Sequence, residues 1–264
     1  MTLTEANLQA QATWNNKACG SRSSDEQAPE YAEMRRRRYE EDDPWVPSAL
    51  DFPSMNGKHV LEIGHGMGCD LATAALSGAI THGIDLTPNH HEIAKRTFDV
   101  LGLPRDLHLG NAGQLPFSDH SMDVVYSLGV LHHTDNTEQC IAEAHRVLKP
   151  GGTFVVALYH FWSLPHLSLV GRGCLTGKLF RLGYHNLLST IEAGADGITI
   201  KPLVKLNTRR SVRRLLSDFS HTDVSIHGLA YSKLRAIGPM LSPAVGKALE
   251  RRWGWYVVAH ATKK

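Results

Sequence analysis

The sequence predicts an α/β fold with a mostly parallel sheet that helices cover on both faces. Between about residues 58 and 159, apolar strand patterns alternate with helix patterns. The strands are continuously apolar rather than alternating, which is typical of parallel strands that are buried on both faces. A cluster of glycines follows the first strand, where a turn needs a bare backbone. The 264 residues, 42% of them hydrophobic, suffice for one large domain.

The alternating elements can be placed in order along this region. Thr87 and Pro88 form a helix start, with a capping hydroxyl and a proline in the first turn. Lys149–Gly152, "KPGG", predicts a tight turn. The strands are expected over residues 59–63, 80–86, 106–111, 122–128 and 153–159, and the helices over 70–77, 87–102 and 137–148.

The alternation of strand and helix patterns stops after residue 159 and resumes at about residue 211. Residues 160–207 contain many glycines without a period, which predicts an insertion. A helix is expected over 211–220, since Val212, Leu216 and Phe219 share one face, and two strands over 222–229 and 255–262.

Residues 1–54 predict an N-terminal extension that is polar and irregular. Short helices are expected around "APEYAEMRRRRYEE", and Pro44, Pro47 and Pro53 interrupt the end of this region.

Composition narrows the class of protein. No apolar run reaches membrane-spanning length, and "MTLTEANLQA" lacks the apolar core of a signal peptide. The four cysteines are far apart, which predicts a reducing, cytoplasmic compartment without disulfides. No His or Cys pattern has metal-ligand spacing, so we expect no metal. Acidic residues outnumber basic ones up to residue 159, and the reverse holds afterwards, so nucleic acid is not the expected partner although a local basic surface is possible.

The glycine loop in "VLEIGHGMGCD" points to a particular kind of ligand. A phosphate-binding P-loop needs Lys-Ser/Thr after its last glycine, and Cys69-Asp70 stands there instead. The G-x-G-x-G spacing also differs from the dinucleotide fingerprint. Glu62, two residues before the loop, would repel a pyrophosphate but suits an ammonium group. We therefore expect a nucleoside that carries a positive charge, and S-adenosylmethionine fits.

Four ordered motifs carry a family resemblance over about residues 58–159. "LEIGHGMG", "GIDLT", "GNAGQLPFSDHSMDVVYSLGVLHHTDN" and "RVLKPGG" resemble class I S-adenosylmethionine-dependent methyltransferases. They are most similar to the small-molecule branch of ubiquinone and menaquinone methyltransferases (methyltransferase type 11). The resemblance implies a Rossmann-like sheet of seven strands, the last antiparallel, within a methyltransferase domain of residues 55–264. It also implies a lid over residues 1–54 and a cap on the acceptor pocket over residues 160–207, after the fifth strand.

The resemblance implies roles for the cofactor residues, with S-adenosylmethionine as the cofactor. Asp85 would accept hydrogen bonds from both ribose hydroxyls, because a carboxylate has two acceptor oxygens. Asn111 stands where the family usually has Asp, and its carbonyl could still accept from the adenine. The remaining contacts are expected from Glu62 and the Gly64, His65, Gly66 and Gly68 loop at the methionine portion, from Leu86 and Ala112 at the adenine, and from Ser127 and Leu128 at the methionine side.

The candidates around the acceptor each have a plainer interpretation. His132, His133 and Tyr159 follow strand ends at the site and could act as a base or orient the acceptor, or could simply pack there. His160 could line the acceptor pocket or its rim. Arg38 and Tyr39 could hold the cofactor carboxylate, with Trp14 and Tyr31 closing the lid, whereas most of the arginine run is interpreted as a solvated helix face. Arg209, Arg210, Arg213 and Arg214 are interpreted as a surface helix.

The expected function is methyl transfer from S-adenosylmethionine to a small molecule of secondary metabolism, by in-line displacement. Three alternatives stay open: an RNA or protein methyltransferase, an enzyme that uses the same cofactor for alkylation or elimination, and a binding module without catalysis. The acceptor, the methylated atom and the oligomeric state are not predicted.

Overall fold

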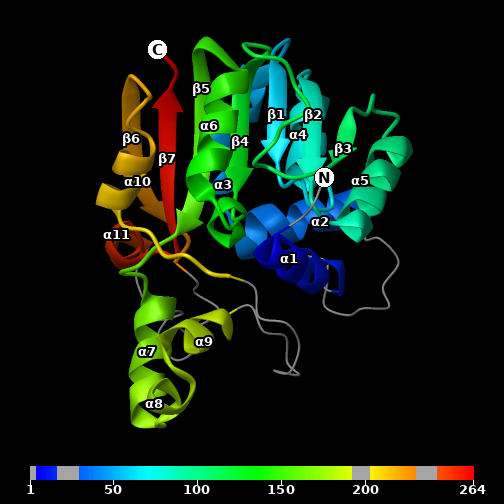
Figure 1. Cartoon of the computed structure of the whole chain (residues 1–264). Helices are drawn as coiled ribbons and strands as arrows, with labels where there is room; N and C mark the ends of the chain where they lie inside the picture. The colour runs from blue at the N-terminus through cyan, green and yellow to red at the C-terminus, as the bar shows by residue number, and fades with distance from the viewer. Residues whose placement is uncertain (1–3, 17–29, 192–202, 230–242) are drawn as a thin grey trace.

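The computed structural model describes residues 4–16, 30–191, 203–229 and 243–264. Seven strands form one sheet in the order β3-β2-β1-β4-β5-β7-β6 (Figure 1). β1 to β5 pair in parallel, and β7 runs antiparallel to both β5 and β6. The predicted fold class and strand count are confirmed. The strands are β1 (His59–Ile63), β2 (Ile80–Asp85), β3 (Leu107–Leu109), β4 (Met122–Leu128), β5 (Leu148–Tyr159), β6 (His221–His227) and β7 (Tyr256–Thr262).

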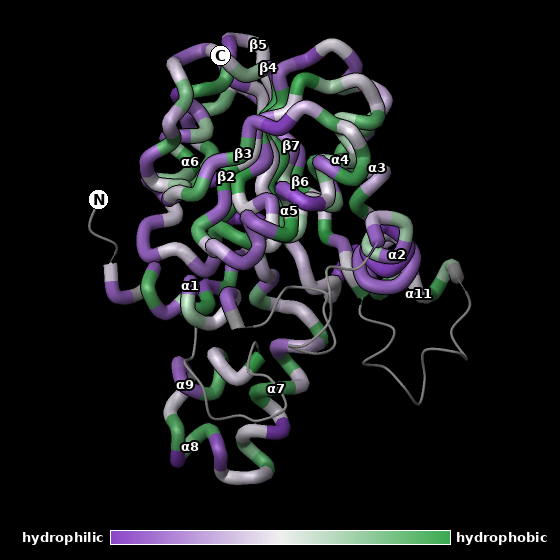
Figure 2. Tube along the Cα trace, turned by 90° about the vertical axis from the view of Figure 1, so that its right-hand side faces the viewer, coloured by the Kyte–Doolittle hydropathy of each residue, from purple (hydrophilic) through white to green (hydrophobic). Residues whose placement is uncertain are grey.

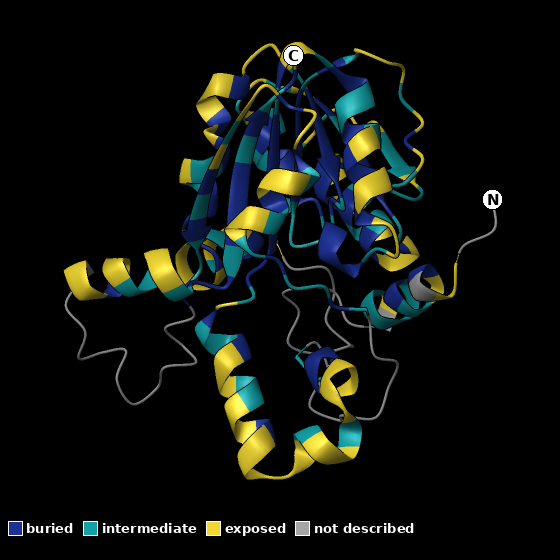
Figure 3. Cartoon of the chain, turned by 60° about the vertical axis from the view of Figure 1, so that its left-hand side comes forward, coloured by how far each residue is buried: buried dark blue, intermediate teal, exposed yellow. Residues whose placement is uncertain are grey.

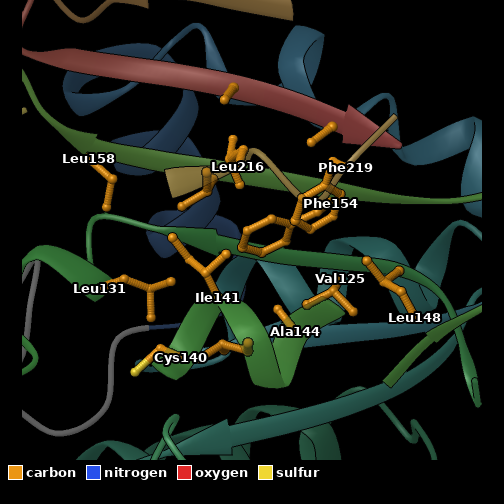
Figure 4. Close-up of a cluster of buried hydrophobic side chains, with 14 of the residues drawn as sticks. Val125, Leu131, Cys140, Ile141, Ala144, Leu148, Phe154, Leu158, Leu216 and Phe219 are labelled. Atoms are coloured by element: carbon orange, nitrogen blue, oxygen red, sulfur yellow. The ribbon is translucent and has the colours of Figure 1, made fainter. Parts of the chain in front are cut away.

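Successive residues of the central strands enter two separate apolar layers. Val125 and Phe154 face a layer with α6 and the region of α10, whereas Val124 and Val155 face a layer with the segment before β1. Figure 4 shows the first layer. Because both faces are covered, these strands are apolar at every position rather than at every second one.

The helices of the core follow the predicted order. α4 (Cys69–Leu76) and α5 (Pro88–Val100) follow β1 and β2, and α6 (Thr137–Val147) joins β4 to β5. α10 (Arg209–Leu215) buries Val212, while its four arginines are exposed as predicted. The short helical turn η3 (Leu131–His133) follows β4.

Three local predictions are corrected. Residues Glu5–Asn16, expected to be irregular, form α1, and α11 (Pro243–Trp253) was not predicted. The "KPGG" segment is not a separate turn but the beginning of β5. The register between β4 and β5 shifts between Met122 and Val124, and Gly151 has a φ of +77°, so the strand absorbs the glycine as an irregularity.

The segment before β1 is mostly helical. It contains α2 (Tyr31–Arg36), the π-helical turn η1 (Arg37–Asp42), α3 (Val46–Leu50) and the 3-10 turn η2 (Phe52–Met55). The insertion after β5 contains α7 (Leu164–Leu175), α8 (Lys178–Leu182) and α9 (Tyr184–Ser189). Within the described ranges, no helix is both long and apolar enough to span a bilayer.

Phe154 offers a direct test of the first apolar layer. Its side chain is fully buried and stacks on Phe219 at 5.7 Å between ring centroids. We predict that Phe154→Ala lowers the free energy of unfolding by about 3–5 kcal/mol, because it removes buried surface and leaves a cavity. Urea unfolding measures this loss. Val100→Ala, at an exposed position, should change stability by less than about 0.5 kcal/mol; equal effects of the two substitutions would contradict the assigned core.

Candidate functional site

A cavity of about 710 Å³ lies at the carboxyl ends of the parallel strands. Its walls include the residues that end β1, β2, β4 and β5 and the turns that follow them. Figure 1 shows α1 and α2 at this end of the sheet. Sites for small molecules typically have this volume and this position in α/β folds.

Most of the residues singled out in the sequence line this cavity. They are Trp14, Arg38, Glu62, Gly64, His65, Gly66, Asp85, Leu86, Asn111, Ala112, Leu128, His133 and Tyr159. The others, which are Tyr31, Tyr39, Gly68, Ser127, His132 and His160, do not line it.

In the glycine loop after β1, Gly64 packs closely against another turn, whereas Gly66 borders open space. A Cβ on Gly64 would lie 2.4 Å from the side chain of Val130, so only glycine lets these two turns meet. Gly66 has a φ of +52°, and a Cβ there would meet nothing within 4 Å. Gly66 therefore presents bare backbone to the cavity in a conformation that side chains rarely adopt.

Asp85 joins this loop to the end of β2. Its Oδ2 accepts a hydrogen bond from the Gly66 N–H at 2.9 Å, and its Oδ1 accepts one from the Thr87 N–H at 2.8 Å. A carboxylate oxygen can accept a second bond. The side chain is therefore fixed in place and still has acceptor capacity toward the cavity.

Glu62 is a buried acid near the end of β1. Its Oε2 accepts a hydrogen bond from the Tyr126 hydroxyl at 3.1 Å. No salt bridge to Glu62 forms within the part of the chain that the structure describes. Burial, with the nearby Asp70 carboxylate, raises the pKa of Glu62 well above its ordinary value. A cation in the cavity would relieve this cost.

A second buried acid, Asp70, is by contrast neutralised. The Arg38 guanidinium binds Asp70, with Nη2 at 2.9 Å from Oδ2, and also binds Asp43. The Tyr39 hydroxyl donates to Asp70 Oδ1 at 2.9 Å, and the Trp45 indole donates to Asp43. Burial opposes the charge of Arg38, but the two carboxylates raise its pKa. This network fastens η1 to the first turn of α4.

The network changes the interpretation of two aromatic lid candidates. Tyr39 points to Asp70 and Thr73, and the Tyr31 hydroxyl lies 2.8 Å from Thr73 Oγ1. A lid contact was expected to line the cavity. Both tyrosines instead secure the N-terminal segment to α4. Arg38 does line the cavity, but its guanidinium is already shared between two carboxylates.

Helix α1 covers the adjoining side of the cavity. Gln11 donates to the Leu86 carbonyl at 2.8 Å, and the Asn89 N–H donates to Asn15. The indole of Trp14 lies 5.5 Å from the His133 ring. These contacts place a helix that the sequence did not predict beside the residues that end β2.

An aromatic cluster forms the wall near the end of β5. The His132 and Tyr159 ring centroids are 3.7 Å apart, and Trp255 lies 4.2 Å from Tyr159. His132 is fully buried behind this wall, and neither of its ring nitrogens has a hydrogen-bond partner among the residues that the structure describes. Burial and the neighbouring His133 hold the pKa of His132 well below its ordinary value. His132 is therefore placed to support Tyr159 rather than to reach an acceptor.

His133 and His160 have different surroundings. The Nδ1 of His133 lies 2.8 Å from the Leu203 carbonyl, which can only accept, so the neutral ring carries its acceptor lone pair on Nε2. His160 is buried with its Nδ1 at 3.1 Å from the Gly254 carbonyl. It ties the insertion to the turn before β7 and is not among the residues that line the cavity, which agrees with the packing role rather than with a place in the pocket.

Three further predicted residues support the site through backbone contacts. The Ser127 hydroxyl donates to the Ile63 carbonyl at 2.9 Å, which joins β4 to β1. Gly68 precedes α4 and lies close to Ala94, and Asn111 Oδ1 accepts from the Gly113 N–H. Asn111 lines the cavity as well, next to Ala112.

The sequence reasoning missed two groups of lining residues. Asp70 was not singled out, although an acid in the first turn of a helix after a glycine loop was a usable signal. Nothing in the local sequence indicated Asn7, Gly228 or Glu250, which also line the cavity. Among the described residues, no group of three or more His, Cys, Asp or Glu side chains is arranged to hold a metal ion.

Comparison with known proteins finds similarity to methyltransferases over the central part of the chain. The family model described as "Methyltransferase domain" matches residues 61–156. Phthiotriol/phenolphthiotriol dimycocerosates methyltransferase of Mycobacterium tuberculosis is 38% identical over 105 residues, which are 39% of this chain and 38% of that protein. Demethylmenaquinone methyltransferase of Tropheryma whipplei is 37% identical over 103 residues, which are 38% of this chain and 41% of that protein. The chain thus matches about two fifths of the length of these relatives.

A solved structure resembles almost the whole chain. Geranyl diphosphate methyltransferase, in complex with GPP and sinefungin, aligns with a TM-score of 0.62 and 15% identity. The alignment covers 99% of this chain and 100% of that protein. At this identity, the likeness shows the fold.

The Arg38 network yields a prediction about stability. Arg38→Gln leaves the buried carboxylates of Asp70 and Asp43 without their cation, and we expect a loss of about 3 kcal/mol in the free energy of unfolding. Urea unfolding of the chain without ligand measures it. Arg36→Gln is the matched control, because the Arg36 ion pairs are exposed and should contribute little. A similar, small effect of both substitutions would show that η1 is held by other contacts.

Proposed function

We propose that this chain, whose residues 61–156 form a class I S-adenosylmethionine-dependent methyltransferase domain, transfers a methyl group to an apolar small molecule. One observation carries the proposal. Two buried carboxylates, Glu62 and Asp85, end adjacent strands and line the same cavity, and neither is paired with a cation within the described residues.

The residues present fit the cofactor. S-adenosylmethionine, when bound, supplies a methyl group that its sulfonium makes electrophilic. Glu62 is suited to the ammonium group, because a cation would offset the burial that raises its pKa. Asp85 is suited to the ribose hydroxyls through its remaining lone pairs, and Gly66 leaves room for close approach.

The adenine would lie on the side of Leu86, Asn111 and Ala112. These three residues line the cavity beyond Asp85, where the turns after β2 and β3 meet. Asn111 Oδ1 already accepts from Gly113 and can accept one further hydrogen bond. The departure from the family's usual Asp therefore keeps an acceptor at this position.

The opposite side of the cavity is aromatic and suits an apolar acceptor. It includes Trp14, Tyr159, Trp255 and Tyr256, together with Ile191 and Leu229. His133 lines this side, and its hydrogen bond to Leu203 directs Nδ1 away as the donor. The Nε2 of His133 would accept the proton of an acceptor that arrives protonated, whereas His132 lies behind the wall.

The lid and the cap are part of the proposal. Residues 1–54 would close the cofactor side, since η1 is fastened to α4 and α1 to the turn after β2. Residues 160–207 would border the acceptor side, where Ile191 lines the cavity. Exclusion of water by both segments would favour transfer to the acceptor over hydrolysis.

The names of the relatives support the class of acceptor. The matched proteins act on phthiotriol dimycocerosates and on demethylmenaquinone. Together with the aromatic wall, these names favour a lipid-like acceptor over RNA or protein. A role in secondary metabolism is part of the same proposal. The alternative of alkylation or elimination would be recognised by methylthioadenosine, instead of S-adenosylhomocysteine, as the product.

Calorimetric titration with S-adenosylmethionine and S-adenosylhomocysteine tests the cofactor site. We expect micromolar binding to the unmodified chain, and Asp85→Ala should weaken it by about 2–3 kcal/mol, because charge-assisted hydrogen bonds are lost. Asp99→Asn is the control, since this exposed acid on α5 lies outside the cavity. Absence of binding to the folded, unmodified chain would contradict the proposed function.

The raised pKa of Glu62 predicts opposite effects on affinity and stability. Ionised Glu62 is disfavoured without ligand, so its contribution to stability is complete below the ordinary carboxyl pKa of about 4.3 and is lost as pH rises through the raised value. Glu62→Gln should therefore raise the melting temperature of the ligand-free chain near neutral pH. Cofactor affinity should rise with pH over the same range, because the ammonium group needs the carboxylate.

Calorimetry over a pH series separates these effects. Glu62→Gln should bind the cofactor more weakly and lose the part of the pH dependence that comes from this carboxyl. Retention of the full dependence in Glu62→Gln would show that another group titrates.

A further inference from the structure

The insertion after β5 forms a helical hairpin that projects from the body of the protein. α7 runs away from the end of β5, α8 lies at the remote end, and α9 lies on the returning side (Figures 1 and 2). We call the region around the α7–α8 turn, residues 172–184, the hairpin tip. The tip lies at the end of the hairpin that is remote from the sheet (Figure 1).

The base of the hairpin is packed against the cavity wall. Leu188 is buried with Tyr159 and Trp255, and Leu169 and Ile191 pack on the same cluster. Where α7 meets α9, a Cβ on Gly173 would lie 2.5 Å from Leu187, so the two helices are in close contact. These contacts fix the position of the hairpin relative to the cavity wall.

The tip exposes large apolar side chains. Leu175 is 89% exposed and Phe180 is 81% exposed, on either side of the turn at Gly177. Tyr184, which begins α9 and closes the tip, is also exposed. Figure 3 shows the outer surface of α7 and α8 as mostly exposed. Isolated apolar residues are common on surfaces, but several on one projection indicate an interaction site.

The charge around these residues has one sign. No Asp or Glu occurs between residues 160 and 191. Arg172, Lys178 and Arg181 are exposed at the tip, next to Leu175 and Phe180. A second copy of this surface would be repelled, because like charges would meet without an acid to pair with them. An anionic surface with an apolar interior satisfies both features.

We propose that the hairpin tip docks on an anionic lipid bilayer. Leu175 and Phe180 would enter the boundary between headgroups and acyl chains, and the three basic side chains would remain among the headgroups. The exposed Tyr184, at the start of α9, is an aromatic residue within the tip, and aromatic side chains with a polar end favour this boundary. The base of the hairpin borders the acceptor side of the cavity, so the bilayer could supply a lipid-like acceptor, a use that rests on the proposed function.

Vesicle co-sedimentation of the full chain tests the docking surface. One set of vesicles contains phosphatidylcholine alone, and the other contains phosphatidylcholine and phosphatidylglycerol in equal amounts. We expect binding to the anionic vesicles that weakens as salt is added. Leu175→Ser combined with Phe180→Ser should reduce the partition coefficient at least about tenfold.

Two further variants make the result specific. Arg172→Gln combined with Lys178→Gln and Arg181→Gln should reduce binding to the anionic vesicles by on the order of fivefold for each charge. Leu76→Ser combined with Val100→Ser removes exposed apolar side chains on α4 and α5, away from the tip, and should leave binding unchanged. Circular dichroism confirms that each variant is folded.

The outcomes separate this proposal from its competitors. Failure of the folded chain to bind anionic vesicles would overturn it, and so would binding that the tip variants do not affect. Self-association in sedimentation velocity that the Leu175→Ser/Phe180→Ser variant abolishes, without vesicle binding, would assign the tip to a protein contact instead. None of these measurements needs methyl transfer, so the docking surface and the proposed function can fail independently.

Discussion

The cavity depends on the Asp85 carboxylate, which holds together the turns that leave β1 and β2. Its two oxygens accept the N–H groups of Gly66 and Thr87, and these bonds satisfy backbone donors that would otherwise be left at the bottom of the cavity. The turn after β4 completes the arrangement, because Val130 fits only against a residue without a Cβ at position 64. The Asp85 side chain thus links the two turns and keeps acceptor capacity toward the cavity.

Two further buried acids of the site, Asp70 and Glu62, differ in how their charge is compensated. Asp70 is paired with Arg38, which the N-terminal segment brings to the start of α4. Within the described part of the chain, Glu62 forms no ion pair and accepts a hydrogen bond from the Tyr126 hydroxyl, and burial raises its pKa. A fold that secures one acid with its own cation and leaves its neighbour uncompensated has a site suited to a cationic ligand. Without a ligand, the buried Glu62 carboxyl lowers the stability of the protein near neutral pH.

Much of the fold could be predicted because its signals are local. Continuous apolar strands, the glycine loop and the Thr87-Pro88 helix start indicate a covered parallel sheet without knowledge of any contact. α1 has a polar sequence with little amphipathic pattern, so it was not predicted. Its position comes from the hydrogen bonds of Gln11 to the turn after β2 and of Asn15 to the first turn of α5. Gly151 and Gly152 predict a turn at the beginning of β5. The pairing of β5 with β4 and β7, which the local sequence does not show, makes this segment part of the strand.

The sequence by itself determined the motif-bearing side of the site, because Glu62, Gly66 and Asp85 stand at strand ends that a parallel sheet brings to one edge. Tertiary structure decided which nearby side chains face the cavity. His132 and His133 are adjacent in sequence, yet one is buried behind Tyr159 and the other lines the wall. Arg38 and Asp70 are far apart in sequence, and only folding makes them a pair. Such choices depend on packing between distant segments, which no local pattern encodes.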